Sequence, residues 1–209
     1  MDNHIQVTRS NVVTLRTDVL ENLYRFRTEM FYNRLKWDVN IANGLEKDQY
    51  DEADPVYLFS HNQQHEIQSC ARLLPTTRPY MLREVFSQML QGEAAPQDET
   101  VWELSRFAVI PSGSTAQPQQ AIFHPMTFRL MQEAVDFADQ TGIQRYVIVT
   151  SVALEKLLRR IGLSMRRFGL GQPVWIGNVL SVACWIDIND QTRRAVYPTA
   201  VTGPRKEAA

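Results

Sequence analysis

Charged side chains occur inside apolar segments of the first half of this chain, where they could hold a substrate or move a proton. Glu103 and Arg106 lie three residues apart in the segment Trp102–Val109, most of which is apolar. Burying a charge costs free energy unless the charge is paired and hydrogen-bonded. One interpretation is therefore a structural ion pair at the edge of a sheet. The other is a carboxylate that faces a cleft and orients or deprotonates an amine.

The faces of this segment depend on its backbone. In a regular strand, Glu103 and Ser105 share one face. Arg106 then lies on the other face, with Trp102 and Leu104. A bulge near Ser105 would change that assignment.

A second group of charges combines two acids with two arginines. Asp48 and Asp51 lie on either side of Tyr50 in a segment without clear periodicity, and acids in such a loop are usually solvated. They could instead bind a cationic ligand or pair with Arg27 and Arg72. Arg72 lies in an apolar strand-like segment, so it needs a carboxylate partner there.

Two aromatic residues, Phe31 and Trp37, follow Arg27 along the chain. Such residues belong by default to the hydrophobic core. Their faces would also suit a sulfonium or amine ligand, because an aromatic ring attracts a cation. The sequence leaves both interpretations open.

Five basic residues lie close together in the last third of the chain: Lys156, Arg159, Arg160, Arg166 and Arg167. Charges like these often form a solvated surface. Because the net charge of the whole chain is −1, this local positive charge could also speed encounter with an acidic partner protein.

The composition fits one domain, residues 1–209, with a sizeable core, since 44% of the residues are hydrophobic and 22% are charged. The net charge argues against nucleic-acid binding, and no apolar stretch approaches the roughly 20 residues that span a bilayer. The N-terminal residues show no secretory signal, so we expect a cytoplasmic protein in which Cys70 and Cys184 are free, buried thiols. The four histidines form no metal-ligand pattern, and we expect no metal.

Hydrophobic periodicity predicts the order of helices and strands. We expect helices over residues 18–35, 123–140 and 154–161, the first capped by Asp18 and the last two ended by Gly142 and Gly162, and a short amphipathic helix or helical turn over residues 80–90. We expect strands over residues 55–60, 66–74, 101–109 and 146–150, and one or two strands over 174–188. The run 146–150 should be central and buried. Loops or turns are expected over residues 37–51, 62–65, 92–100 and 111–114. This order predicts a mixed α/β fold with one main sheet.

Taken together in order and spacing, eight positions resemble the acyl-homoserine-lactone synthases of the LuxI type: Arg27, Phe31, Trp37, Asp48, Asp51, Arg72, Glu103 and Arg106. Each carries the residue type found in that family, and Trp102–Phe107 is the strongest matching segment. Pro79–Leu82, Val149–Ser151 and Arg167–Gly169 are also similar to the family. The resemblance covers nearly the whole chain.

This resemblance implies the GNAT-like N-acyltransferase fold, an α/β (α+β) fold whose mixed central sheet is flanked by helices and splayed by a cleft for the acyl donor. It implies an enzyme that acylates the amine of S-adenosyl-L-methionine from an acyl carrier protein. The product then closes to a lactone and methylthioadenosine leaves. S-Adenosylmethionine is a substrate here, and no cofactor is implied. Residues 1–55 would form a flexible region at the S-adenosylmethionine site.

The resemblance also assigns roles to residues. Catalytic roles fall to Glu103, Arg106, Asp48, Asp51 and Arg72, with Glu103 as the first candidate for the base. Contacts with S-adenosylmethionine fall to Arg27, Phe31, Trp37, Ser105 and Phe107. The acyl pocket is expected at Thr150, Val149, Leu154 and Leu157, and the five basic residues are expected to dock the carrier protein.

The alternative is another GNAT-like N-acyltransferase that uses acyl-coenzyme A and a different amine. Such enzymes usually bind pyrophosphate at a glycine-rich turn, and the turn after the central strand, Ser151–Ala153, has no glycine. A ligand sensor that uses the same cleft without catalysis is a third interpretation. The completeness of the charged set disfavours it.

Overall fold

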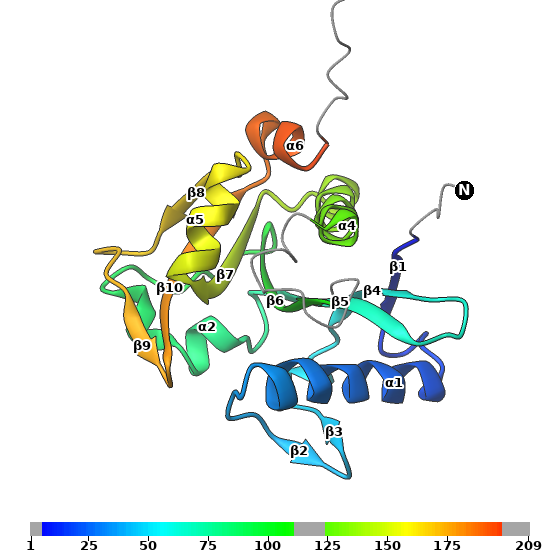
Figure 1. Ribbon diagram of the computed structural model, residues 1–209. Coiled ribbons are helices and arrows are strands. Elements are labelled where there is room, and N and C mark those ends of the chain that lie inside the picture. Colours follow the sequence, from blue (N-terminus) through cyan, green and yellow to red (C-terminus); the bar gives the residue numbers. More distant parts are fainter. Residues whose placement is uncertain (1–5, 111–123, 198–209) are drawn as a thin grey trace, which may run out of the picture.

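The computed structural model describes residues 6–110 and 124–197 (Figure 1). Its strands are β1 (Thr8–Asn11), β2 (Ile41–Ala42), β3 (Leu45–Glu46), β4 (Val56–His61), β5 (Ile67–Pro75), β6 (Val101–Val109), β7 (Arg145–Ser151), β8 (Met165–Arg167), β9 (Val174–Ile176) and β10 (Val179–Asp187). Its α-helices are α1 (Thr17–Arg27), α2 (Met81–Glu84), α4 (Pro125–Thr141), α5 (Val152–Arg160) and α6 (Asp190–Val196). A π-helical segment, Thr28–Arg34, continues α1, and 3-10 turns cover Gln49–Glu52 and Ser87–Leu90.

One mixed sheet contains most of these strands, in the order β1-β4-β5-β6-β7-β10-β8, with β9 paired to β10. Neighbouring strands are antiparallel except β6 and β7, which are parallel. β2 and β3 form a separate two-stranded hairpin. The mixed α/β fold with one main sheet that the sequence predicts is confirmed.

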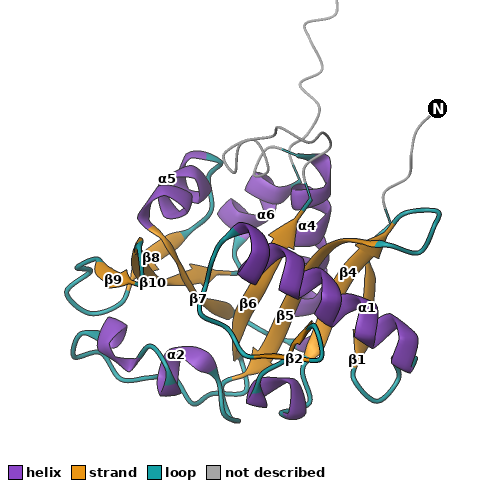
Figure 2. Ribbon diagram, turned by 60° about the horizontal axis from the view of Figure 1, so that its bottom comes forward, coloured by secondary structure: helices purple, strands orange, loops and turns teal. Residues whose placement is uncertain are grey.

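Helices cover both faces of this sheet (Figures 1 and 2). α4 packs on one face, where Ala138 and Ile148 belong to the same buried cluster. α1 packs on the opposite face of β4 and β5, where Leu23 contacts the cluster that contains Tyr57. α2 extends this second cover toward β7 and β10 through Leu82. The second face is the one that carries the charged residues described below.

β6 and β7 separate part-way along their length. Their pairing ends at Glu103 and Val147, although β6 continues to Val109 and β7 to Ser151. Beyond this point the facing edges of the two strands form no ladder with each other, because a parallel ladder needs the strands to stay side by side. The sheet is therefore splayed, and Glu103 lies where the two strands part.

The first helix differs from its prediction. α1 ends at Arg27, and the remaining residues to Arg34 are π-helical, which is uncommon in this length. Asp18 does not cap α1. The N-cap residue is Arg16, whose guanidinium donates to the Asp18 carboxylate at 2.8 and 3.1 Å, so that carboxylate is not free to accept from the helix backbone.

Most other elements begin and end near their predicted positions. β6 spans the predicted strand 101–109, and α4 ends at Gly142, whose φ of +77° is the left-handed conformation that suits glycine after a helix. The expected loop 37–51 contains the hairpin β2–β3 and a 3-10 turn, and the expected helix 80–90 is divided into α2 and a 3-10 turn. The turn expected at 111–114 lies outside the described residues.

Candidate active site

Three arginines and three carboxylates form one connected cluster on the second face of the sheet. α1 contributes Arg27, β5 contributes Arg72 and β6 contributes Arg106, while the segment from β3 to the following 3-10 turn contributes the acids. We call this cluster the charge network; it consists of Arg27, Glu46, Asp48, Asp51, Arg72 and Arg106. Arg27, Arg72, Glu46 and Asp51 are almost entirely buried.

Asp51 is the buried acceptor that joins α1 to β5. Its two oxygens accept hydrogen bonds from Arg27 at 2.7 and 3.0 Å, and one of them also accepts from Arg72 at 2.7 Å. The Tyr57 hydroxyl donates to the same carboxylate at 2.5 Å. Burial alone would raise the pKa of Asp51, but attraction to Arg27 and Arg72 outweighs burial and lowers this pKa well below its usual range.

Asp48 joins Arg72 to Arg106. Its oxygens accept from Arg72 at 2.5 and 3.0 Å and from Arg106 at 2.8 Å. Asp48 also caps the 3-10 turn, because its carboxylate accepts from the Tyr50 backbone while Asp51 accepts from the Asp48 backbone at 2.9 Å. This reciprocal capping turns both carboxylates toward the arginines. The expectation that the two acids are solvated is therefore wrong, and their pairing with Arg27 and Arg72 is confirmed.

Glu46, which the sequence analysis missed, completes the charge network. Its side chain is fully buried, and it accepts hydrogen bonds from the Nε atom of Arg27 and from Arg106, the latter at 2.9 and 3.3 Å. The sequence offered Glu103 as a third acid for the three arginines, but in the described residues Glu103 pairs with none of them, and Glu46 takes that place. Glu46 follows the apolar Leu45 in a segment without clear periodicity, so its burial could not be predicted from the sequence pattern.

A bulge in β6 brings Arg106 onto the face of Glu103. In the pairing of β5 with β6, Arg72 lies opposite Ser105 and Cys70 lies opposite Ala108. One residue of β5, between Cys70 and Arg72, therefore faces two residues of β6, between Ser105 and Ala108. Arg106 has φ of +51°, which is strained for a residue with a Cβ atom. Ser105 shares the face, since its hydroxyl accepts from Arg72 Nε at 3.2 Å.

Glu103 does not form the structural ion pair at a sheet edge that was one of its two interpretations. β6 is an inner strand rather than an edge, and within residues 6–110 and 124–197 Glu103 forms no ion pair. Its carboxylate instead accepts the backbone N–H groups of Met81 at 3.1 Å and Leu82 at 2.7 Å, at the start of α2. Burial raises the pKa of Glu103, and these two hydrogen bonds with the nearby Arg72 and Arg106 offset only part of that rise.

Phe31 and Trp37 form a stacked pair beside the network. Their ring centroids are 5.2 Å apart with an interplanar angle of 19°, and the Arg106 guanidinium lies 5.5 Å from the Phe31 centroid. Phe31 is 1% exposed and Trp37 is 40% exposed. Phe31 is thus a core residue that also contacts the network, whereas Trp37 presents an aromatic face to solvent.

The remaining predicted substrate residues are not all brought together. Phe107 packs with the core cluster under α4, on the face opposite the charge network. Val149 packs toward α2, while Leu157 packs in the α4 cluster and Leu154 is 37% exposed. Thr150 pairs with a residue of that α4 cluster, so it lies on the same side as Leu157. The four residues predicted for the acyl pocket therefore face different parts of the molecule.

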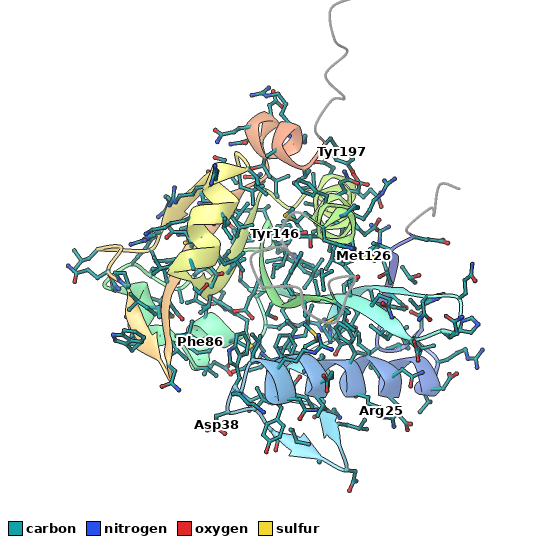
Figure 3. The ribbon with its side chains drawn as sticks, in the orientation of Figure 1. Arg25, Asp38, Phe86, Met126, Tyr146 and Tyr197 are labelled. Carbon is teal, nitrogen blue, oxygen red and sulfur yellow. The ribbon has the colours of Figure 1, made fainter. Side chains whose placement is uncertain are left out.

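The α4 side of β7 is filled by core side chains near these residues. Tyr146, labelled in Figure 3, is buried there, and its hydroxyl donates to the Ala134 carbonyl at 2.7 Å. Met126, also labelled, packs against the same cluster and accepts a hydrogen bond from Ser60.

The basic residues of the last third are partly neutralised. Arg159 and Arg167 both pair with the buried Glu155, at 2.9 and 2.6 Å. Arg166 pairs with Glu93 at 2.8 Å and stacks over a tryptophan ring. Lys156 and Arg160 are exposed, and in the described part of the chain they form no ion pair. Within the described residues no group of acids, histidines and cysteines could hold a metal, and no helix is long and apolar enough to cross a membrane.

Comparisons with known proteins agree with this geometry. A family model described as autoinducer synthase matches residues 11–196. An acyl-homoserine-lactone synthase from Aliivibrio fischeri (strain ATCC 700601 / ES114) is 35% identical over 192 residues, which cover 92% of this chain and 98% of that protein. The chain belongs to the autoinducer synthase family. It is accordingly an enzyme, an acyltransferase of the acyl-homoserine-lactone synthase type.

Solved structures extend the comparison to the fold of this synthase. The AHL synthase LasI gives a TM-score of 0.82 at 32% identity and covers 97% of this chain and 99% of its own. BjaI, a CoA-dependent acyl-homoserine lactone synthase solved with SAM and isopentyl-CoA, gives 0.79 at 26% identity, over 92% and 88%. A putative N-acetyltransferase from Lactobacillus plantarum, at 15% identity and a TM-score of 0.58 over 90% and 100%, shares the fold alone. The expected GNAT-like fold is confirmed.

Proposed function

We propose that this synthase transfers an acyl group from an acyl carrier protein to the amine of S-adenosylmethionine, and that the acylated product closes to a homoserine lactone and releases methylthioadenosine. The observation that carries the proposal is the place of Glu103. This carboxylate lies where β6 leaves β7, beside the charge network, and the related synthase BjaI was solved with SAM and isopentyl-CoA. The acyl-homoserine lactone would serve as a quorum-sensing signal.

The charge balance of the site suits a substrate with net positive charge. Arg27, Arg72 and Arg106 are matched by the three acids of the network, so Glu103 adds one further negative charge when it is ionised. S-Adenosylmethionine carries an ammonium, a sulfonium and a carboxylate, which sum to one positive charge. The exposed face of Trp37 adds an aromatic surface for the sulfonium.

Glu103 is the candidate base for the first step. The substrate amine is protonated at neutral pH and must lose a proton before it attacks the thioester carbon. Burial raises the pKa of Glu103, which makes its carboxylate a stronger proton acceptor than an exposed glutamate. Each oxygen accepts one backbone hydrogen bond, so lone pairs remain for the ammonium or for a bridging water.

The second step needs chiefly a folded substrate. A carboxylate oxygen of the acylated intermediate attacks the γ-carbon, the carbon–sulfur bond breaks, and its electron pair goes to sulfur to give neutral methylthioadenosine. An enzyme that holds the two reacting atoms in contact lowers the entropic part of the activation free energy. The charge network and the stacked aromatic pair are the rigid groups that would hold the substrate in that shape.

Two acyl donors suit this site, because coenzyme A and the carrier protein present the same phosphopantetheine arm. Two exposed basic residues, Lys156 and Arg160, favour the carrier protein, which is strongly acidic. A second candidate is an acyl-coenzyme A donor, favoured by the likeness to the CoA-dependent BjaI. The unpaired edges of β6 and β7 would accept the arm of either donor.

The test is mass spectrometry of organic extracts from a heterologous host that expresses the chain, beside a Glu103→Gln variant and an empty vector. We expect a homoserine lactone from the wild type and none from the variant or the vector. Purified enzyme given S-adenosylmethionine with matched acyl-carrier-protein and acyl-coenzyme A donors then identifies the donor. A soluble, folded wild type that makes no lactone with either donor would contradict the proposal, and a fully active Glu103→Gln would remove Glu103 from the mechanism.

A further inference from the structure

Met81 contacts both Glu103 and two arginines of the charge network. It is the first residue of α2, and its backbone N–H is one of the two that hold Glu103. Its thioether sulfur lies 3.2 Å from Nη2 of Arg72 and 3.3 Å from Nη1 of Arg106, and accepts a hydrogen bond from each. Met81 is only partly buried, so part of the residue is open to solvent.

The sulfur is a poor match for these donors. A thioether is a weak acceptor, whereas guanidinium N–H groups form their strongest hydrogen bonds with carboxylates. Other N–H groups of both arginines already bind acids, since Arg72 donates to Asp48 and Asp51 while Arg106 donates to Glu46 and Asp48. Arg72 Nη2 also donates to Asp48 at 3.0 Å, so its second N–H is the one that meets the sulfur. In the described part of the chain, Arg106 Nη1 donates to the sulfur and to no acid.

We propose that the Met81 thioether holds the position that the substrate's α-carboxylate takes between Arg72 and Arg106 when S-adenosylmethionine binds. This inference rests on the proposed function and names the subsite for one group of that substrate. The carboxylate would displace the sulfur and accept from both arginines. The neighbouring ammonium then lies near Glu103, whose carboxylate is held by Met81's own backbone.

The same arrangement explains how the product could leave. Lactone closure converts the carboxylate into an ester, which has no charge and accepts hydrogen bonds more weakly. Arg72 and Arg106 then lose their strong acceptor, and the flexible Met81 side chain can return to them. Met81 is thus a positioning residue that competes with the substrate and not with the product.

Direct binding separates this role from a structural one. We would titrate the purified enzyme by calorimetry with S-adenosylmethionine and, separately, with methylthioadenosine, which has the same adenosine part but no carboxylate. Met81→Leu removes the competing acceptor at nearly the same volume, so S-adenosylmethionine should bind roughly three- to tenfold more tightly. Met81→Gln supplies a stronger acceptor, so the same ligand should bind more weakly. Neither change should alter methylthioadenosine binding.

Met89→Leu is the matched control, because Met89 is buried in the same core cluster as α2 and should leave both affinities unchanged. Opposite shifts for Met81→Leu and Met81→Gln, confined to S-adenosylmethionine, would support the proposal. Parallel changes for both ligands, or no change for either, would overturn it. A wild type that binds methylthioadenosine but not S-adenosylmethionine would overturn the proposed substrate as well, which distinguishes the two failures.

Discussion

Glu46 binds Arg106 through both of its carboxylate oxygens, at 2.9 and 3.3 Å, while one of them also accepts from Arg27. Glu46, in the two-residue strand β3, thereby connects α1 to the bulge of β6. Glu46 and Arg106 are 60 positions apart in the sequence. The side chain of Glu46 has no solvent exposure, so water cannot take its place as hydrogen-bond acceptor for either arginine.

Removal of Glu46 should therefore destabilise the fold strongly. Glu46→Ala leaves two buried guanidinium groups short of an acceptor, and breaking a buried pair in this way costs about 3 to 5 kcal/mol. Urea unfolding measures the change in free energy. Glu52→Ala is the control, because Glu52 is exposed and, among the described residues, forms an ion pair only with the exposed Lys47, which contributes about 0 to 1 kcal/mol. Equal losses in the two variants would contradict this account of Glu46.

Acid should weaken the network through Asp51. Burial alone would raise the pKa of Asp51, but Arg27 and Arg72 lower it well below its usual range. Since the unfolded value is about 3.9, the ion pairs contribute their full stability above that pH and lose it as the pH falls toward the lower folded value. The free energy of unfolding should fall between about pH 5 and about pH 2.

The variant Asp51→Asn isolates this effect. It is less stable at neutral pH, since Arg27 and Arg72 lose a charged acceptor, but its stability should vary less with pH over the acid range. Urea unfolding of both proteins across that range gives the two slopes. If the slopes match, other carboxylates carry the acid sensitivity.

Several parts of this site follow from the sequence because they depend on residue type and spacing. The charges in β5 and β6 stand out in apolar strands, and a buried charge requires a partner wherever it lies. The pairing of Arg72 with Asp48 and Asp51 could be expected on that ground alone. The β-branched run in β7 likewise predicts a central strand.

Other parts depend on backbone geometry that no residue pattern announces. Strict alternation sends Arg106 to the wrong face, and only the bulge at φ of +51° returns it to the face of Glu103. The two backbone N–H groups that hold Glu103 belong to α2, whose position follows from long-range packing. Because backbone N–H groups bind the Glu103 carboxylate, the residue types in the sequence do not identify its partners.

The two stacked aromatic residues should have different roles, with Phe31 stabilising the fold and Trp37 contributing to substrate binding. Phe31 is 1% exposed, so Phe31→Ala should cost about 3 to 5 kcal/mol of stability. Trp37 is 40% exposed, so Trp37→Ala should cost about 1 kcal/mol and weaken S-adenosylmethionine binding about three- to thirtyfold, through loss of the ring that faces the sulfonium. Thermal unfolding and calorimetric titration measure the two effects. Trp37→Phe should recover most of the affinity, and its failure to do so would argue against a role for the aromatic face.

The carrier-protein surface should depend on exposed charges rather than on the whole basic group. Arg159 and Arg167 hold the buried Glu155, so reversing either would place two acids together and destabilise α5. Arg160 and Lys156 are exposed and in the described residues carry no ion pair. Any effect of reversing them falls on the encounter with the partner.

Arg160→Glu should therefore raise the KM for acyl carrier protein about tenfold at low salt and leave the KM for S-adenosylmethionine unchanged. Arg25→Glu is the matched control, since Arg25 is exposed on α1, far from α5 in Figure 3, and should change neither value. Steady-state kinetics at two salt concentrations measures both, because added salt screens exposed charges and should shrink the difference between wild type and Arg160→Glu. An equal rise in both KM values, or an effect that salt does not reduce, would mean that Arg160 acts on the fold or on the S-adenosylmethionine site and not on docking.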